Sequence, residues 1–190
     1  MNSFYSEYEL EILGLKKYGK NVLISKKCSI YGAGDIEIGD NVRIDDFSIL
    51  SGKLTLGNYI HIAAYTALYG GNVGITIDDF STISSRGVVY AISDDYSGNT
   101  MTNPMVTDMY RGVIKASVSI GRHVIIGTGT SILPGAVIEE GVAVGAMSLV
   151  KDKLRPWGIY AGIPCERIRE RSKALLILEK QFLMEEGKYE

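Results

Sequence analysis

Two adjacent carboxylates, Asp94 and Asp95, lie in a stretch of the chain, residues 91–116, that contains no histidine. A carboxylate is a weak general base for a hydroxyl group, but it suffices for an ammonium group, which loses its proton far more easily. Asp94 is therefore our first candidate for a group that orients and deprotonates an amine, and Asp95 is the close alternative. The competing interpretation is that both residues cap a turn, since an Asp-Asp-Tyr-Ser-Gly string is typical of turns.

The polar turn Ser84-Ser85-Arg86 follows Ile83, shortly before this stretch. The Ser84 hydroxyl can donate a hydrogen bond to a carbonyl oxygen or accept one from an amine. The guanidinium of Arg86 can bind a diphosphate through paired hydrogen bonds. A purely structural interpretation stays open, in which Ser84 completes a turn and Arg86 forms an exposed ion pair.

Of the two histidines in the chain, His61 is the runner-up as a base. It directly precedes the aliphatic residue Ile62, so we expect it on an outer flat face of the repeat described next. A structural imidazole packed against a neighbouring molecule is an equally open interpretation. His123 is expected at a turn and not as the base.

The elements that position these side chains follow from an aliphatic residue at every sixth position, which we call an anchor. The anchors run through two stretches: Ile38, Ile44, Leu50, Leu56, Ile62 and Leu68, and then Ile120, Ile126, Ile132, Ile138, Val144 and Val150. Neither an α-helix nor a half-buried strand has a period of six. Four residues after most anchors stands a small or β-branched residue, such as Ser48, Thr66 or Ala136. Such a hexapeptide repeat predicts a β-helix, in which three hexads make one triangular coil.

The repeat predicts one domain with short additions. We expect an N-terminal capping helix in residues 1–19, drawn over 3–18, and a hexapeptide β-helix over 20–165. The repeat stops between 91 and 116, and a loop of this length inside a compact repeat points to function. Residues 166–190 carry an amphipathic pattern that predicts a C-terminal helix over the other open end. Large side chains are expected to point outward from flat faces at Phe47, Tyr59, Tyr65 and Tyr69.

Composition argues against several classes of protein. A net charge of −2 does not indicate a protein that binds nucleic acid. No stretch approaches the ~18 apolar residues of a membrane span, and the N-terminus lacks the features of a secretory signal, so we expect a cytoplasmic protein. Cys28 falls at a small-residue position of a hexad and predicts a buried thiol. No Cys or His spacing suggests a disulfide framework or a metal site, so no metal is expected.

The hexads, the interrupting loop and the closing run Gly158-Ile159-Tyr160-Ala161-Gly162-Ile163-Pro164 together resemble the left-handed β-helix acyltransferases. The string Ser93-Asp94-Asp95-Tyr96-Ser97-Gly98 is similar to nucleotide-linked amino-sugar N-acyltransferases, of the type acting on dTDP-4-amino-4,6-dideoxyglucose. The resemblance implies an all-β fold, a left-handed parallel β-helix with short N- and C-terminal helices and one long inserted loop. It also implies a homotrimer with sites between subunits, and acetyl-CoA or another acyl-CoA as the donor.

For the acceptor side, the resemblance suggests N-acylation, because O-acetyltransferases of this superfamily typically place a histidine in the interrupting loop. The predicted catalytic residues are Asp94, Ser84 and His61. The residues predicted to contact the nucleotide-linked amino sugar are Ser85, Arg86, Asp95 and Tyr96.

For the donor side, the resemblance implies that the coenzyme lies along the later coils. Its predicted contacts are Gly127, Thr128 and Ala146 for the pantetheine, Lys151, Lys153, Arg155 and Lys173 for the 3′-phosphate, and Pro164 for the adenine. The small residues can equally serve only to fit tight corners. Cys165 stands where the family usually has alanine, and this small change leaves the inference intact.

We therefore expect direct acyl transfer in a ternary complex, in the synthesis of O-antigen, lipopolysaccharide or another cell-surface polysaccharide. Two alternatives remain open. The first is a sugar or galactoside O-acetyltransferase with His61 as base. The second is a β-helix without enzymatic activity, either a scaffold like that of the γ-carbonic anhydrases or a binding module.

Overall fold

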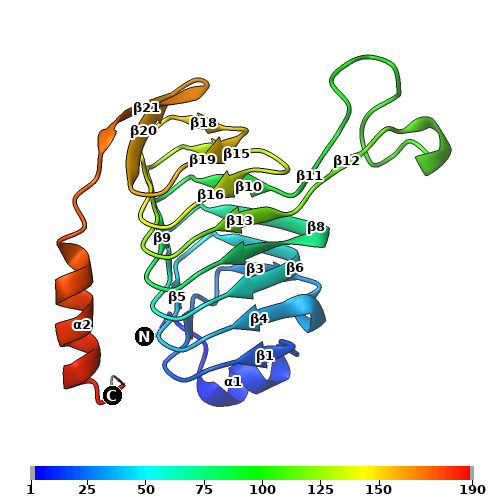
Figure 1. The fold of residues 1–190 in the computed structure, drawn as a ribbon. Helices are drawn as coiled ribbons and strands as arrows, with labels where there is room; N and C mark the ends of the chain where they lie inside the picture. The colour runs from blue at the N-terminus through cyan, green and yellow to red at the C-terminus, as the bar shows by residue number, and fades with distance from the viewer. Residues whose placement is uncertain (1–2, 189–190) are drawn as a thin grey trace.

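The computed structural model describes residues 3–188, which form a triangular prism of short parallel strands wound into stacked coils (Figure 1). The first face contains β2 (Leu23–Ile24), β5 (Arg43–Ile44), β7 (His61–Ile62), β9 (Thr82–Ile83), β14 (Ile125–Ile126), β17 (Ala143–Val144) and β20 (Gly158–Gly162). The second contains β3 (Ser29–Tyr31), the first parts of β6 (Ile49–Leu56) and β8 (Ala67–Ile77), β10 (Val88–Tyr90), β15 (Ser131–Ile132) and β18 (Leu149–Val150). The third contains β1 (Lys17–Tyr18), β4 (Ile36–Ile38), the last parts of β6 and β8, β13 (Val118–Ile120), β16 (Val137–Ile138) and β19 (Lys153–Leu154).

The core of the prism is the column of anchors predicted from the repeat. Ile44, Leu50, Ile62 and Ile126 have no exposed surface, and burying each such side chain stabilises the fold by about 1.5–3 kcal/mol relative to exposing it. The small residues four positions after the anchors, such as Thr66, are buried as well. The hexapeptide β-helix is therefore confirmed.

The corners of the prism are formed by the third residue after an anchor, often in the left-handed backbone conformation. Asparagine and glycine adopt this conformation with least strain. The chain nevertheless places Phe47 (φ 60°), Tyr59 (φ 56°) and Tyr65 (φ 62°) there. The prediction that these three point outward from flat faces is wrong, because they stand at corners; only Tyr69 lies on a face, in β8, where it stacks on Tyr90.

The N-terminal helix α1 covers only Glu7–Ile12 of the predicted span 3–18. Ser6 and Glu9 form a capping box at its start, and Leu10 is buried against the first coil. The helix is short because Lys17 and Tyr18 already pair with β4 as strand β1, ahead of the predicted boundary at residue 20. The irregularity in the repeat near Gly32 is the 3-10 turn η1 (Ala33–Asp35).

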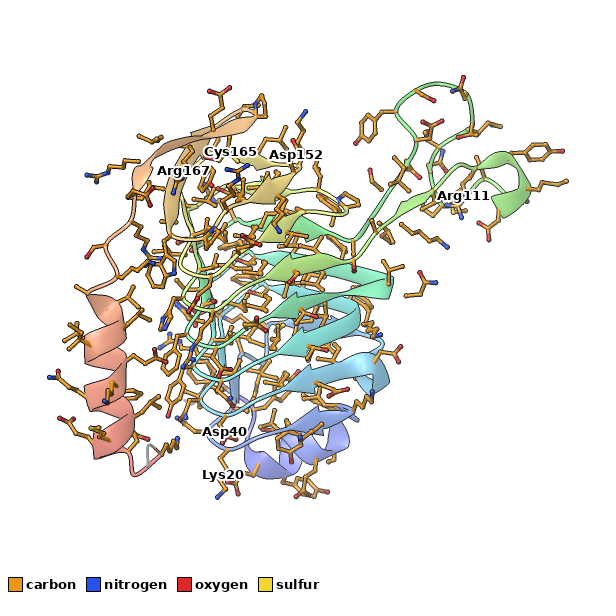
Figure 2. All side chains as sticks on the ribbon, viewed as in Figure 1. Lys20, Asp40, Arg111, Asp152, Cys165 and Arg167 are labelled. Carbon is orange, nitrogen blue, oxygen red and sulfur yellow. The ribbon has the colours of Figure 1, made fainter. Side chains whose placement is uncertain are left out.

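The C-terminal segment differs from the prediction of a helix that covers the open end. Strand β21 (Cys165–Glu170) folds back antiparallel on β20 and covers the edge of the last coil; Figure 2 labels Cys165 and Arg167 there. Helix α2 is confined to Leu175–Glu185 and runs along the flank of the prism (Figure 1). The end-capping prediction is wrong because the hairpin already satisfies that edge. No helix within residues 3–188 is both long and apolar enough to cross a bilayer.

The stretch without hexads leaves the prism as a projecting arm, residues 94–113 (Figure 1). Its base is an antiparallel pair of β11 (Ile92–Ser93) and β12 (Ile114–Lys115), and it contains the 3-10 turn η2 (Asp108–Tyr110). Arg111, labelled in Figure 2, forms an ion pair with Asp108 within the arm. The arm thus carries its own network of contacts away from the hydrophobic core.

Candidate active site

The turn Ser84-Ser85-Arg86 lies at the corner between the first and second faces, directly after β9. It is held between neighbouring coils by backbone hydrogen bonds, from Ser84 N to Ile126 O at 2.9 Å and from Arg86 N to Ala64 O at 3.2 Å. Thr128 Oγ1 donates to Ser85 O at 2.6 Å. The predicted residues Ser84, Ser85, Arg86, Gly127, Thr128 and Ala146 therefore share one corner of the prism.

The Ser84 hydroxyl is the group of this corner best suited to meet a substrate. Ser84 is half-buried, and its hydroxyl has no hydrogen-bond partner within residues 3–188. Its backbone is fixed because Ser84 O accepts from Thr66 Oγ1 at 3.3 Å. A fixed backbone with an unused hydroxyl can hold a donor toward a developing oxyanion.

The two arm carboxylates differ in their surroundings. Asp95 accepts hydrogen bonds from the Ser97 backbone, the Ser97 hydroxyl and the Thr100 hydroxyl at 2.8–2.9 Å, which lower its pKa. This matches the turn interpretation for Asp95. Asp94 accepts a single hydrogen bond, from Asn103 N at 3.2 Å, and is half-buried. Asp94 therefore keeps most of its acceptor capacity, whereas Asp95 uses its own to build the arm.

His61 lies on the outer side of β7, as predicted. Its Nε2 is 2.8 Å from Asp45 Oδ2, and Arg43 Nε donates to the other carboxylate oxygen at 2.7 Å. Partial burial raises the pKa of Asp45, but the hydrogen bonds from His61 and Arg43 outweigh it and lower the pKa overall. The imidazole is thus paired with a carboxylate on an exposed face.

The three predicted catalytic residues come from different elements of the chain. The arm with Asp94 leaves the prism between β10 and β13, whereas Ser84 lies between β9 and β10 and His61 lies on the first face. No hydrogen bond or ion pair within the described chain joins any two of them. Tyr96 follows the end of β11 by three residues and is 92% exposed, so its side chain is open to a substrate.

The residues predicted to bind the acyl-CoA donor differ in the contacts that they already make within the protein. Gly127 packs so closely on the next coil that a Cβ would lie 2.4 Å from Ala146 N, which supports the corner-fitting role of this glycine. Lys153 is paired with Glu139 at 2.7 Å, and Lys173 lies over the Trp157 ring at 5.5 Å.

Three further residues that are predicted to bind the acyl-CoA donor have exposed side chains. Lys151 and Arg155 are exposed, and neither side chain has an ion pair among residues 3–188. Pro164 is exposed in the turn between β20 and β21.

One feature of this corner escaped the sequence analysis. Phe47 and Tyr65 stack with ring centroids 5.0 Å apart, and Arg86 stands on the next coil of the same corner. Each of the three residues is the third after an anchor, so the repeat itself carried the signal. Within the described residues, no group of three or more His, Cys, Asp and Glu side chains is arranged to hold a metal ion.

Comparison with known proteins gives close relatives over nearly the whole chain. The dTDP-4-amino-4,6-dideoxy-D-glucose acyltransferase of Escherichia coli is 44% identical over 183 residues, which is 95% of each chain. The structure of AntD, an N-acyltransferase from Bacillus cereus in complex with dTDP and 3-hydroxybutyryl-CoA, superposes with a TM-score of 0.97 at 56% identity. That match covers 98% of this chain and 100% of AntD. AntD has also been solved with the substitutions D94N, D94A and S84A.

The fold and its repeats define a left-handed β-helix acyltransferase of the hexapeptide-repeat class. The chain belongs to the dTDP-4-amino-4,6-dideoxyglucose acyltransferase family. No family model matches the sequence.

Proposed function

We propose that this protein transfers an acyl group from acyl-CoA to the amino group of dTDP-4-amino-4,6-dideoxyglucose or a closely similar nucleotide-linked amino sugar. The observation that carries the proposal is the 44% identity, over 95% of both chains, to an acyltransferase named for that sugar. The arm supports it, because it offers the lightly bonded Asp94 carboxylate in a segment without histidine.

Acyl transfer from a thioester to an amine requires one proton acceptor and one hydrogen-bond donor. Asp94 holds the ammonium group of the sugar and takes its proton, and the freed amine attacks the thioester carbonyl carbon. The Ser84 hydroxyl donates to the carbonyl oxygen as it gains negative charge. The carbon–sulfur bond then breaks, the nitrogen of the new amide loses its extra proton, and CoA leaves as its thiol by taking up that proton. AntD was studied with substitutions at its D94 and S84, and this chain has Asp94 and Ser84 at the same numbers.

The site is proposed to form between copies of the chain in a homotrimer. This assembly is supported by the absence of any hydrogen bond between the Asp94 and Ser84 side chains within residues 3–188. The arm also exposes apolar side chains, with Met105 at 92% and Met109 at 81%. Light scattering should give three times the mass of one chain, and a stable monomer at micromolar concentration would contradict the shared site.

The test of the reaction is release of free CoA thiol with matched acceptors. The enzyme is given acetyl-CoA or 3-hydroxybutyryl-CoA with dTDP-4-amino-4,6-dideoxyglucose, or with the dTDP sugar that has a hydroxyl in place of the amine. Thiol release with the amine alone is the expected result. The UDP-linked amino sugar then tests the role of the nucleotide.

A second candidate is sugar O-acetylation, favoured by the pairing of His61 Nε2 with Asp45 at 2.8 Å. A carboxylate that orients an imidazole is the arrangement used to deprotonate hydroxyl groups. Preferential turnover of the hydroxyl acceptor, abolished by His61→Ala, would put this candidate first. In either case we place the reaction in the cytoplasm, in the synthesis of a cell-surface polysaccharide such as O-antigen, where activated sugars are modified before assembly.

A further inference from the structure

The corner between the first and second faces presents one residue on each coil, at the third position after the anchor. On successive coils these residues are Lys27, Phe47, Tyr65, Arg86, Gly129 and Met147. All of them are long or aromatic except Gly129, which has no side chain. The glycine therefore leaves a gap of one coil between Arg86 and Met147, which we call the corner notch.

The side chain of Met147 bends back from the following coil and lies over this notch. A Cβ at Gly129 would lie 2.5 Å from Met147 Sδ, 3.8 Å from its Cγ and 3.9 Å from its Cε, and these are the three atoms nearest to it. Met147 is nevertheless 67% exposed. Its thioether thus occupies the space above Gly129 while most of the side chain remains open to solvent.

Two other glycines of this corner provide an internal comparison. A Cβ at Gly127 would lie 2.4 Å from Ala146 N, and one at Gly87 would lie 2.6 Å from Ile83 Cγ2. Rotation relieves neither contact, because the first is with backbone and the second is with a fully buried β-branched side chain. Methionine has three rotatable bonds and adapts its shape readily. The notch is therefore a place at this corner that one side-chain rotation can open.

The notch adjoins the turn that carries the Ser84 hydroxyl. Gly129 N donates to Ser85 O at 3.1 Å, so Gly129 lies on the coil next to that turn. Thr128, a predicted contact of the pantetheine, donates to the same carbonyl oxygen through its hydroxyl at 2.6 Å. A thioester whose carbonyl oxygen meets Ser84 therefore has the notch beside its acyl group.

The chemistry of the notch suits an alkyl chain. Its movable wall is the thioether and methyl group of Met147, which are apolar and polarizable. Moving the methylene groups of an acyl chain out of water and against this wall is favourable in proportion to the apolar area that is buried. An acetyl group has no methylene to place there, so the notch can distinguish donors by the length of their acyl chain.

We propose that the corner notch at Gly129 receives the acyl chain of the donor and that Met147 determines how long a chain is transferred. The inference rests on the proposed function and names the class of donor, acyl-CoA thioesters with chains longer than acetyl. An acetyl group leaves Met147 in place. A longer chain takes the position of the thioether above Gly129, and the Met147 side chain rotates toward solvent.

The experiment compares kcat/KM for acetyl-CoA, butyryl-CoA and hexanoyl-CoA in two variants that change the notch in opposite directions. Met147→Ala removes the movable wall and should raise the ratio of hexanoyl to acetyl transfer about 10-fold or more, since a pocket discriminates one methylene by at least that factor. Gly129→Asn fills the notch and should lower the ratio of butyryl to acetyl transfer by a similar factor. Asparagine is chosen because it tolerates the left-handed backbone of Gly129, at φ 70°. Met184→Ala, at an exposed methionine of α2, is the matched control and should keep both ratios.

Calorimetry with acetyl-CoA and hexanoyl-CoA separates the notch from the reaction, because binding needs no acceptor sugar. Met147→Ala should shift the affinity ratio of these two thioesters toward hexanoyl-CoA. If the wild-type enzyme acylates the amino sugar and both variants keep its preference among chain lengths, the notch is overturned and the function stands. If the wild-type protein acylates no amino sugar but Met147→Ala shifts the affinity ratio, the notch stands and the proposed function fails. Dissociation of the trimer in Met147→Ala, measured by light scattering, would show that Met147 is a subunit contact and would also overturn the notch.

Discussion

Glu179 in α2 and His123 at a corner of the β-helix are joined by a hydrogen bond of 2.9 Å between Oε2 and Nε2. The other carboxylate oxygen of Glu179 pairs with Arg122, and both Glu179 and His123 are almost fully buried. Through these contacts the helix is held on the flank, over Tyr59 and Phe80. The chain's own helix thus covers the aromatic pair on this flank.

Removing the Glu179 charge should loosen the helix. Glu179→Gln leaves Arg122 and His123 without their anionic partner. We therefore expect the free energy of unfolding to fall by about 1–3 kcal/mol and amide exchange across α2 to become faster. Glu185→Gln, at an exposed position of the same helix, is the control and should change neither the free energy of unfolding nor the amide exchange of α2. Hydrogen exchange and thermal unfolding measure both effects, and equal protection of α2 in the two variants would contradict the role of Glu179.

Substitution of Asp94 should affect catalysis and not folding. Asp94→Asn or Asp94→Ala removes the proton acceptor, so kcat/KM should fall at least ~10²-fold, while the trimer and acyl-CoA binding persist. Asp95→Asn should instead increase proteolysis of the arm, because it weakens the bonds to Ser97 and Thr100. Near-full activity of Asp94→Ala together with an inactive His61→Ala would reverse the assignment of the base.

The 3′-phosphate of the donor is expected to bind Lys151 and Arg155, which have no ion pair among residues 3–188. Lys151→Met and Arg155→Met should raise the KM for acetyl-CoA more than they lower kcat, since this contact is equal before and during reaction. Both substitutions should also weaken the preference of the enzyme for acetyl-CoA over the acetylated dephospho-CoA. Lys153→Met and Lys173→Met should act less, because Lys153 is paired with Glu139 and Lys173 lies over Trp157. An unchanged donor preference in all four variants would place the phosphate elsewhere.

A methyl group at Gly127 should separate two coils. The added Cβ would lie 2.4 Å from Ala146 N, a contact with backbone that cannot rotate away, so Gly127→Ala should lower the unfolding temperature and the affinity for acyl-CoA. Gly34→Ala is the matched control, because its Cβ would meet nothing within 4 Å. Equal unfolding temperatures would show that the coils can shift apart at no cost.

Burial of Cys28 should make stability depend on pH in the alkaline range. Desolvation raises the pKa of its thiol to about 12 from 9.0. The folded state therefore holds this proton more tightly, and its contribution is complete below pH 9.0 and is lost as pH rises toward 12. Urea unfolding at several pH values should show a shallower alkaline decline for Cys28→Ala than for the natural chain. Parallel curves would show that Cys28 does not take part.

The sequence by itself determined the β-helix, since a period of six can bury every anchor only if coils stack. It also determined the outward placement of His61 and the burial of Cys28, which follow from their positions relative to Ile62 and Ile24. The location of the break at 91–116 was equally plain, because the anchors stop there. These features are local, and each depends on the spacing along one chain.

Only the tertiary structure showed which side chains of one corner touch. The repeat predicts equivalent positions for Phe47, Tyr65 and Arg86, but the stacking of Phe47 on Tyr65 depends on side-chain conformations that the spacing does not specify. The path of α2 was equally beyond the sequence, since β21 could take the open edge only once β20 had formed it. An amphipathic segment predicts a helix that needs an apolar partner surface. It does not predict which of several surfaces that is, because the choice depends on which edges other segments of the chain already cover.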